Sequence, residues 1–160
     1  MTIAQMYQRE GAGVVRVEHS GGLGSGFVID KDGHILTNAH VVDGAQGTIY
    51  VSFSNNEKVA AQVVGVDNAT DVAVLKVDVP GSALDVMPLG TSKDLEVGAP
   101  VVAIGNPYGY VLGNSEPSVT AGVVSALRRS ILPSGDQAGC QSALGRDVSR
   151  VWLPPPEPMT

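Results

Sequence analysis

The chain has 160 residues, of which 43% are hydrophobic and 16% charged, a composition that indicates one folded domain, or two small ones. Its net charge of −6 argues against nucleic acid as the main partner. Cys140 is the single cysteine, which excludes an internal disulfide and a cysteine-based metal site, and we expect no catalytic role for it.

The predicted elements begin with a short amphipathic turn or helix over residues 3–9 and then change to strands. Apolar runs separated by Gly, Asn, Asp and Pro clusters predict strands at 13–20, 24–30, 34–39, 47–53, 58–67, 71–78, 99–106 and 118–127. The pair Asp32-Gly33 predicts a hairpin turn. No helix-length amphipathic segment separates the strands, so the sequence favours an all-β barrel or sandwich with an aliphatic core.

The last 31 residues differ from the rest, since they hold five of the ten prolines, including the run "LPPPEP". Such a run is extended or polyproline-like. We expect residues 130–160 to form a disordered or loosely attached Pro-rich tail.

Targeting and cofactor motifs give little. We see no signal peptide and no apolar run long enough to span a bilayer, so as written the chain should stay where it is made. "GGLGSGF" (residues 21–27) lacks the third glycine and the following helix of a dinucleotide loop. It predicts a tight turn and close backbone approach instead, and a cofactor enzyme is disfavoured.

Two segments hold the candidate site residues, "ILTNAHVV" with His40 and "NATDVAVLKV" with Asp71. Taken singly, a histidine after a strand and an aspartate in a turn are usually structural. We interpret His19 and His34 in that way, as surface strand or turn histidines without a visible partner.

Four blocks together resemble the HtrA/DegP family of trypsin-like serine proteases, from about residue 3 to about residue 129. They are "GSGFVIDKDGHILTNAHVV", "VVGVDNATDVAVLKVD", "VGAPVVAIGNPYG" and "SVTAGVVSAL". The resemblance implies a trypsin-like double β-barrel. The chain would then consist of an N-terminal segment (1–11), a complete first barrel (12–91), a truncated second barrel (92–129) and the divergent tail (130–160).

By the same resemblance, His40 is the general base and Asp71 orients it. A serine hydroxyl needs an adjacent imidazole to take its proton, and the imidazole needs a carboxylate to fix its tautomer. Intact relatives would cleave unfolded or misfolded proteins without a cofactor. They would do so outside the cytoplasm or at a membrane, as homotrimers built through the segment near Tyr7.

The nucleophile is the missing part. Ser115 follows Gly113-Asn114 as the family's serine follows Gly-Asn, but it precedes the 118–127 strand. Glu116-Pro117 also stands where two glycines after the family's serine permit close backbone packing, and Pro117 has no N–H and restricts Glu116. We do not expect Ser115 to be the nucleophile. No later serine is followed by Gly-Gly-Pro: Ser130, Ser134, Ser142 and Ser149. The sequence therefore predicts a truncated endopeptidase that is inactive alone, with a non-catalytic β-barrel interaction module as the alternative.

Overall fold

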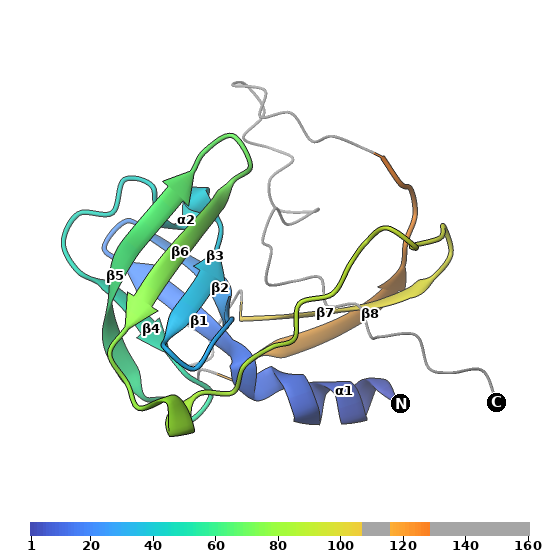
Figure 1. Cartoon of the computed structure of the whole chain (residues 1–160), viewed down its shortest axis with the longest axis horizontal. Helices are drawn as coiled ribbons and strands as arrows, with labels where there is room; N and C mark the ends of the chain where they lie inside the picture. The colour runs from blue at the N-terminus through green and yellow to red at the C-terminus, as the bar shows by residue number, and fades with distance from the viewer. Residues whose placement is uncertain (107–115, 129–160) are drawn as a thin grey trace.

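The computed structural model of the chain describes residues 1–106 and 116–128. Six antiparallel strands form a closed barrel in the order β1-β2-β3-β6-β5-β4, and two more form a separate antiparallel sheet beside it (Figure 1). The barrel strands are β1 (Val14–His19), β2 (Gly22–Val28), β3 (His34–Thr37), β4 (Ile49–Ser52), β5 (Lys58–Asp67) and β6 (Val72–Val77). The second sheet consists of β7 (Pro100–Gly105) and β8 (Ser118–Val123).

Helical structure in the described residues is limited to short pieces: α1 (Ile3–Glu10), α2 (Ala39–Val42) and the 3-10 turns Gly11–Gly13 and Gly81–Ala83. None of these helices is long and apolar enough to cross a membrane. The predicted all-β fold is thus confirmed, with eight strands at the expected places. The predicted Pro-rich tail lies outside the described residues. Within the described residues, the second sheet holds two strands.

Two strand predictions were wrong at their ends. The strand expected over 118–127 stops at Val123. The strand expected over 34–39 stops at Thr37, and the chain turns into α2 at Ala39. Asn38, in extended conformation (φ −85°, ψ 149°), is the N-cap residue between them. The helix has only four residues, too few to show a helical period in the sequence.

The predicted Asp32-Gly33 hairpin turn joins β2 and β3. Gly33 has φ +93°, and a Cβ there would lie 2.4 Å from the backbone oxygen of Val77. The turn therefore requires glycine, both for its left-handed backbone and for its close approach to the end of β6.

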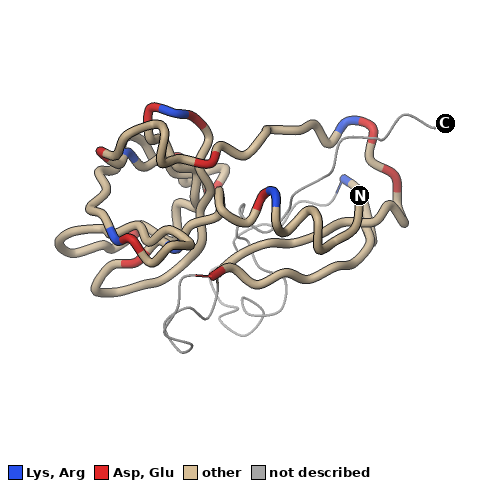
Figure 2. Tube along the Cα trace, turned by 90° about the horizontal axis from the view of Figure 1, so that it is seen from below, with Lys and Arg blue, Asp and Glu red and all other residues tan. Residues whose placement is uncertain are grey.

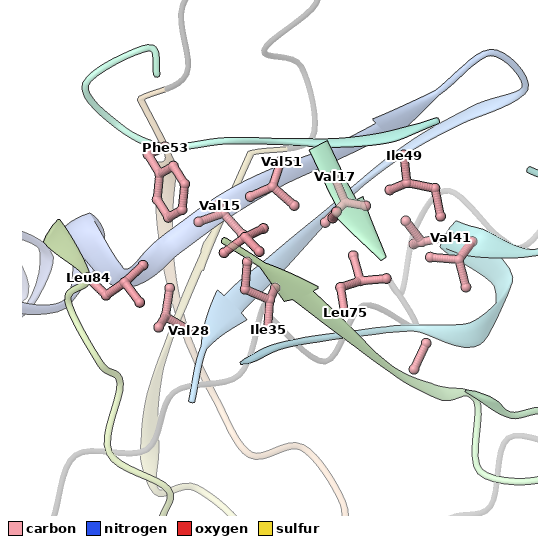
Figure 3. Close-up of a cluster of buried hydrophobic side chains, with 14 residues drawn as sticks. Val15, Val17, Val28, Ile35, Val41, Ile49, Val51, Phe53, Leu75 and Leu84 are labelled. Carbon is pink, nitrogen blue, oxygen red and sulfur yellow. The ribbon is translucent and has the colours of Figure 1, made fainter. Parts of the chain in front are cut away.

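The barrel interior is aliphatic, as the composition predicts (Figure 3). Inward-pointing residues of the strands form one cluster with two residues of α2 and two loop residues, Phe53 and Leu84, and the cluster has a single aromatic member. Its members are Val15, Val17, Val28, Ile35, Val41, Val42, Ile49, Val51, Phe53, Ala61, Ala73, Leu75, Val77 and Leu84. Removing these side chains from water is the main source of the barrel's stability.

A second, smaller cluster joins the barrel to the second sheet. Val14 of β1 packs with Met87 and with Val102 and Ile104 of β7, and Met6 and Tyr7 of α1 cover it. In Figure 1, α1 accordingly runs beside β7 and β8, not beside the barrel core. The cluster fixes β7 next to the end of β1.

Candidate active site

His40 and Asp71 meet because their strands are neighbours in the barrel. β3 and β6 pair antiparallel with Thr37 opposite Ala73. The residues just after Thr37 therefore lie beside those just before Ala73, and these are α2 with His40 and the β5–β6 turn with Asp71. His40 and Asp71 are 31 positions apart in the chain, and β4 and β5 lie between them.

Two short hydrogen bonds join His40 and Asp71. His40 Nδ1 lies 2.7 Å from Asp71 Oδ2, and the backbone N–H of His40 donates to Asp71 Oδ1 at 2.9 Å. A carboxylate can only accept, so the proton of the neutral imidazole is on Nδ1 and Nε2 keeps its lone pair. The His40 side chain is 52% exposed, so the ring is open to a reacting group.

Asp71 is held by Asn38 as well as by His40. Its backbone is in the left-handed region, with φ +58°, which Asp tolerates better than most residues. The amide Nδ2 of Asn38 donates to the Asp71 carbonyl at 2.9 Å and lies 3.4 Å from Oδ2. Sequence reasoning missed Asn38, because it assigned this residue to the strand expected over 34–39.

The turn before Asp71 is ordered by Asp67. Its Oδ2 accepts from the Thr70 hydroxyl at 2.8 Å and its Oδ1 from the Ala69 N–H at 3.0 Å. These hydrogen bonds, the one from Thr70 first, lower the pKa of Asp67 below its ordinary value. The loop thus presents Asp71 in a defined conformation.

The two remaining histidines have the partners that the sequence did not reveal. His19 Nε2 donates to the carbonyl of Val41 at 2.9 Å, while its Nδ1 accepts from the Gly21 N–H at 3.1 Å. His19 therefore anchors α2, which carries His40. His34 Nδ1 lies 2.7 Å from Asp30 Oδ2 in the β2–β3 turn. The pKa of Asp30 is lowered, mainly by the backbone N–H of His34.

In "GGLGSGF", Gly21 lies in the turn before β2 and the other three glycines lie in β2. Two of those in β2 give the close backbone approach that the sequence predicts. A Cβ on Gly24 would lie 2.4 Å from Val41 Cγ2, and one on Gly26 would lie 2.8 Å from the carbonyl of Leu36. Gly24 thereby leaves room for α2 to pack on the barrel directly behind His40.

Ser115, the serine that we do not expect to be the nucleophile, lies outside the described residues. So do Cys140, Ser130, Ser134, Ser142 and Ser149. Pro117, close to Ser115 in the chain, is described, and the Pro117 carbonyl accepts from the Tyr7 hydroxyl at 2.8 Å. Within the described residues, no group of three or more His, Cys, Asp or Glu side chains could hold a metal ion.

The structure thus has a closed antiparallel barrel with a histidine and an aspartate paired at one end, the arrangement of a trypsin-like peptidase domain. Residues 24–152 match the trypsin-like peptidase domain family, past the residue 129 at which the quoted blocks end. The chain belongs to this family, and within it to the HtrA/DegP proteases, as the following relatives show.

A protein of Halomonas elongata named "Probable periplasmic serine endoprotease DegP-like" is 50% identical over 109 residues, 68% of this chain and 21% of that protein. Protease Do-like 1, chloroplastic, of Arabidopsis thaliana is 43% identical over 128 residues, 80% of this chain and 28% of that protein. The solved HtrA-type protease AlgW with tripeptide has a TM-score of 0.73 at 34% identity, covering 83% of this chain and 42% of that one. The chain thus spans about a quarter of the length of these curated relatives.

Proposed function

We propose that His40 and Asp71 are the general base and the orienting carboxylate of a serine-endopeptidase triad. The observation that carries the proposal is the 2.7 Å contact between His40 Nδ1 and Asp71 Oδ2. A carboxylate on Nδ1 keeps Nε2 free to accept the proton of a serine hydroxyl and then stabilises the imidazolium. The exposed ring leaves space for that serine.

The proposal for the chain itself is an HtrA-like endopeptidase without its nucleophile segment, inactive alone. Glu116 and Pro117 after Ser115 cannot replace the two glycines that permit close backbone packing of a nucleophile loop, and no other serine has the expected context. The prediction that Ser115 is not the nucleophile rests on its sequence context.

The proposed substrates of the complete enzyme are unfolded or misfolded proteins, in a compartment outside the cytoplasm. Relatives named as periplasmic and chloroplastic support this. A homotrimer built near Tyr7 remains part of the proposal by family resemblance.

A chimera tests the role of the dyad. Residues 14–106 of this chain would replace the matching segment of the Halomonas elongata relative, and cleavage of casein, an unfolded protein, would be measured. We expect Asp71→Asn to lower turnover on the order of 10⁴-fold and His40→Ala on the order of a million-fold. Asp30→Asn, which alters the other His–Asp pair, should retain activity. A chimera that stays fully active with Asp71→Asn would contradict the assignment.

The chain alone is tested separately with a fluorophosphonate probe, which labels activated serines. We expect no labelling of the 160-residue chain, and labelling of the unmodified chimera. Labelling of Ser115 that disappears in His40→Ala would show that this chain has its own nucleophile.

The alternative, a non-catalytic interaction module, is favoured by β8. All six of its residues are exposed, and neither β7 nor β8 contains a charged residue (Figure 2). Exposed uncharged strands tend to pair with other chains. Light scattering at increasing protein concentration tests this alternative, because an interaction module should assemble and a constant monomer mass would remove it.

A further inference from the structure

Asn38 does not perform the task that its position suggests. As the N-cap of α2, its side chain would ordinarily accept a hydrogen bond from one of the first backbone N–H groups of the helix. It makes no such bond. Its side-chain amide is instead directed at Asp71, with Nδ2 donating to the carbonyl oxygen at 2.9 Å and lying 3.4 Å from Oδ2.

Asp71 has taken over the capping of α2. The backbone N–H of His40, the second residue of the helix, donates to Asp71 Oδ1 at 2.9 Å. The Asp71 carboxylate therefore caps the helix in place of Asn38, and the Asn38 side-chain amide binds Asp71. Such an exchange gives α2 no extra cap, but it ties His40 and Asp71 together through both backbone and side chain.

Asp71 requires such a tie. A residue with a side chain at φ +58° is in a sparsely populated backbone conformation that its surroundings must maintain. Thr70 and Ala69 hold the turn from one side through Asp67. The amide of Asn38 holds it from the barrel side, and its bond to the carbonyl fixes the peptide group from which the Asp71 side chain starts.

Asn38 is itself buried, as are further polar residues of the described chain. The exposed fraction of Asn38 is 1%, and Ser25, Thr37 and Asn106 are 0–2% exposed. The Thr37 hydroxyl donates to the carbonyl of Ser25, and the Ser25 hydroxyl oxygen accepts from the backbone N–H of Asn106, both at 2.8 Å. A buried donor has no bulk water to bond with, so the hydrogen bond that Asn38 makes to Asp71 can set the orientation of its acceptor.

We infer that Asn38 is a positioning residue that orients the Asp71 carboxylate, and through it fixes the His40 tautomer with the proton on Nδ1. The inference rests on the proposed function of the His40–Asp71 pair. Because it concerns the state of one ring, it can be measured in this chain without any proteolysis.

The test is ring nitrogen NMR on the full chain labelled with ¹⁵N-histidine, where His19 and His34 serve as internal references. The nitrogen shifts of His40 report the ratio of its Nδ1–H and Nε2–H forms. Asn38→Leu keeps a similar volume but removes the donor. We expect this ratio to fall by roughly two- to tenfold, the factor that corresponds to one ordinary hydrogen bond.

Thr37→Val is the matched control. It removes a buried hydrogen bond one residue away that does not involve Asp71, so the His40 ratio should not change. If Asn38→Leu does not fold, Asn38→Asp serves in its place, because it keeps the shape but replaces the donor by an acceptor. It should also lower the His40 ratio. An unchanged His40 ratio in a folded Asn38 variant would overturn the inference, and so would an equal change in Thr37→Val.

Asp71→Asn separates the two proposals. If it leaves the His40 ring signals unchanged, the His40–Asp71 pair does not form in solution and the proposed function fails with it. If it changes them while the Asn38 variants do not, the pair stands and only the role of Asn38 is wrong.

Discussion

At the scale of the residue, the site depends on two aspartates of the β5–β6 turn, Asp67 and Asp71, that bind different groups. Asp67 uses both oxygens to order the turn, whereas Asp71 uses both to hold His40. The hydrogen bonds that Asp67 accepts within the turn lower its pKa. Residues of the same type, four positions apart, therefore differ in role because of the donors around them.

Thr70→Val should raise the pKa of Asp67 toward its ordinary value, because the largest stabilising donor of the carboxylate is lost. The folded pKa of Asp67 lies below the unfolded one, so its contribution to stability is present above the unfolded value and lost as the pH falls through the folded one. Carboxyl ¹³C titration measures the shift. Thr70→Ser keeps the hydroxyl and should retain the low pKa; an equal rise in both variants would contradict the assignment.

At the scale of the element, α2 is placed by what it packs against. Val41 is buried against Gly24 of β2, and the carbonyl of Val41 accepts from His19. A helix of four residues has little stability of its own. Its position, and that of His40, is therefore set by the barrel.

Gly24→Ala should destabilise the protein by about 1–3 kcal/mol, because the new Cβ would lie 2.4 Å from Val41 Cγ2. Urea unfolding followed by circular dichroism measures the free energy. Gly65→Ala is the control, since a Cβ there meets nothing within 4 Å, and we expect it to change stability by less than about 0.5 kcal/mol.

Val41→Ala should relieve part of the loss caused by Gly24→Ala, so the double variant should be more stable than the sum of the two single effects. Strict additivity would show that the two side chains do not contact each other in solution.

At the scale of the whole molecule, three elements meet beside the barrel. α1 and β7 pack together over Val14, and the Tyr7 hydroxyl donates to the carbonyl of Pro117 just before β8. Burial first, and then the charge of Glu116, raises the pKa of Tyr7. The hydroxyl therefore remains a donor at a pH where an exposed tyrosine has begun to ionise.

Tyr7→Phe should lower the free energy of unfolding by about 0.5–1.5 kcal/mol at neutral pH. Because the folded pKa is raised, the contribution of Tyr7 is complete below the unfolded value and is lost as the pH rises through the folded one. The wild-type and variant unfolding curves should thus converge at high pH. Tyr50→Phe, at an exposed tyrosine, is the control; a difference between wild type and Tyr7→Phe that persists unchanged above the folded pKa would disprove the account.

The sequence by itself determined the features that repeat locally. Apolar runs between Gly, Asn, Asp and Pro clusters predicted all eight strands, and Asp32-Gly33 predicted the turn that joins β2 and β3. These signals are short in range, since a strand or a tight turn is specified by a few adjacent residues. His40 and Asp71 were assigned as a pair only through the family resemblance of four blocks, not from their own segments.

Only the tertiary structure decided what those residues contact. The bond from Asn38 spans 33 residues, the one from Ser25 to Asn106 spans 81, and the one from Tyr7 to Pro117 spans 110. Such pairings depend on barrel closure and on the β3–β6 register, which no local pattern encodes. For the same reason α2 was missed, because four residues become a helix only when the barrel and Asp71 supply the contacts that they lack alone.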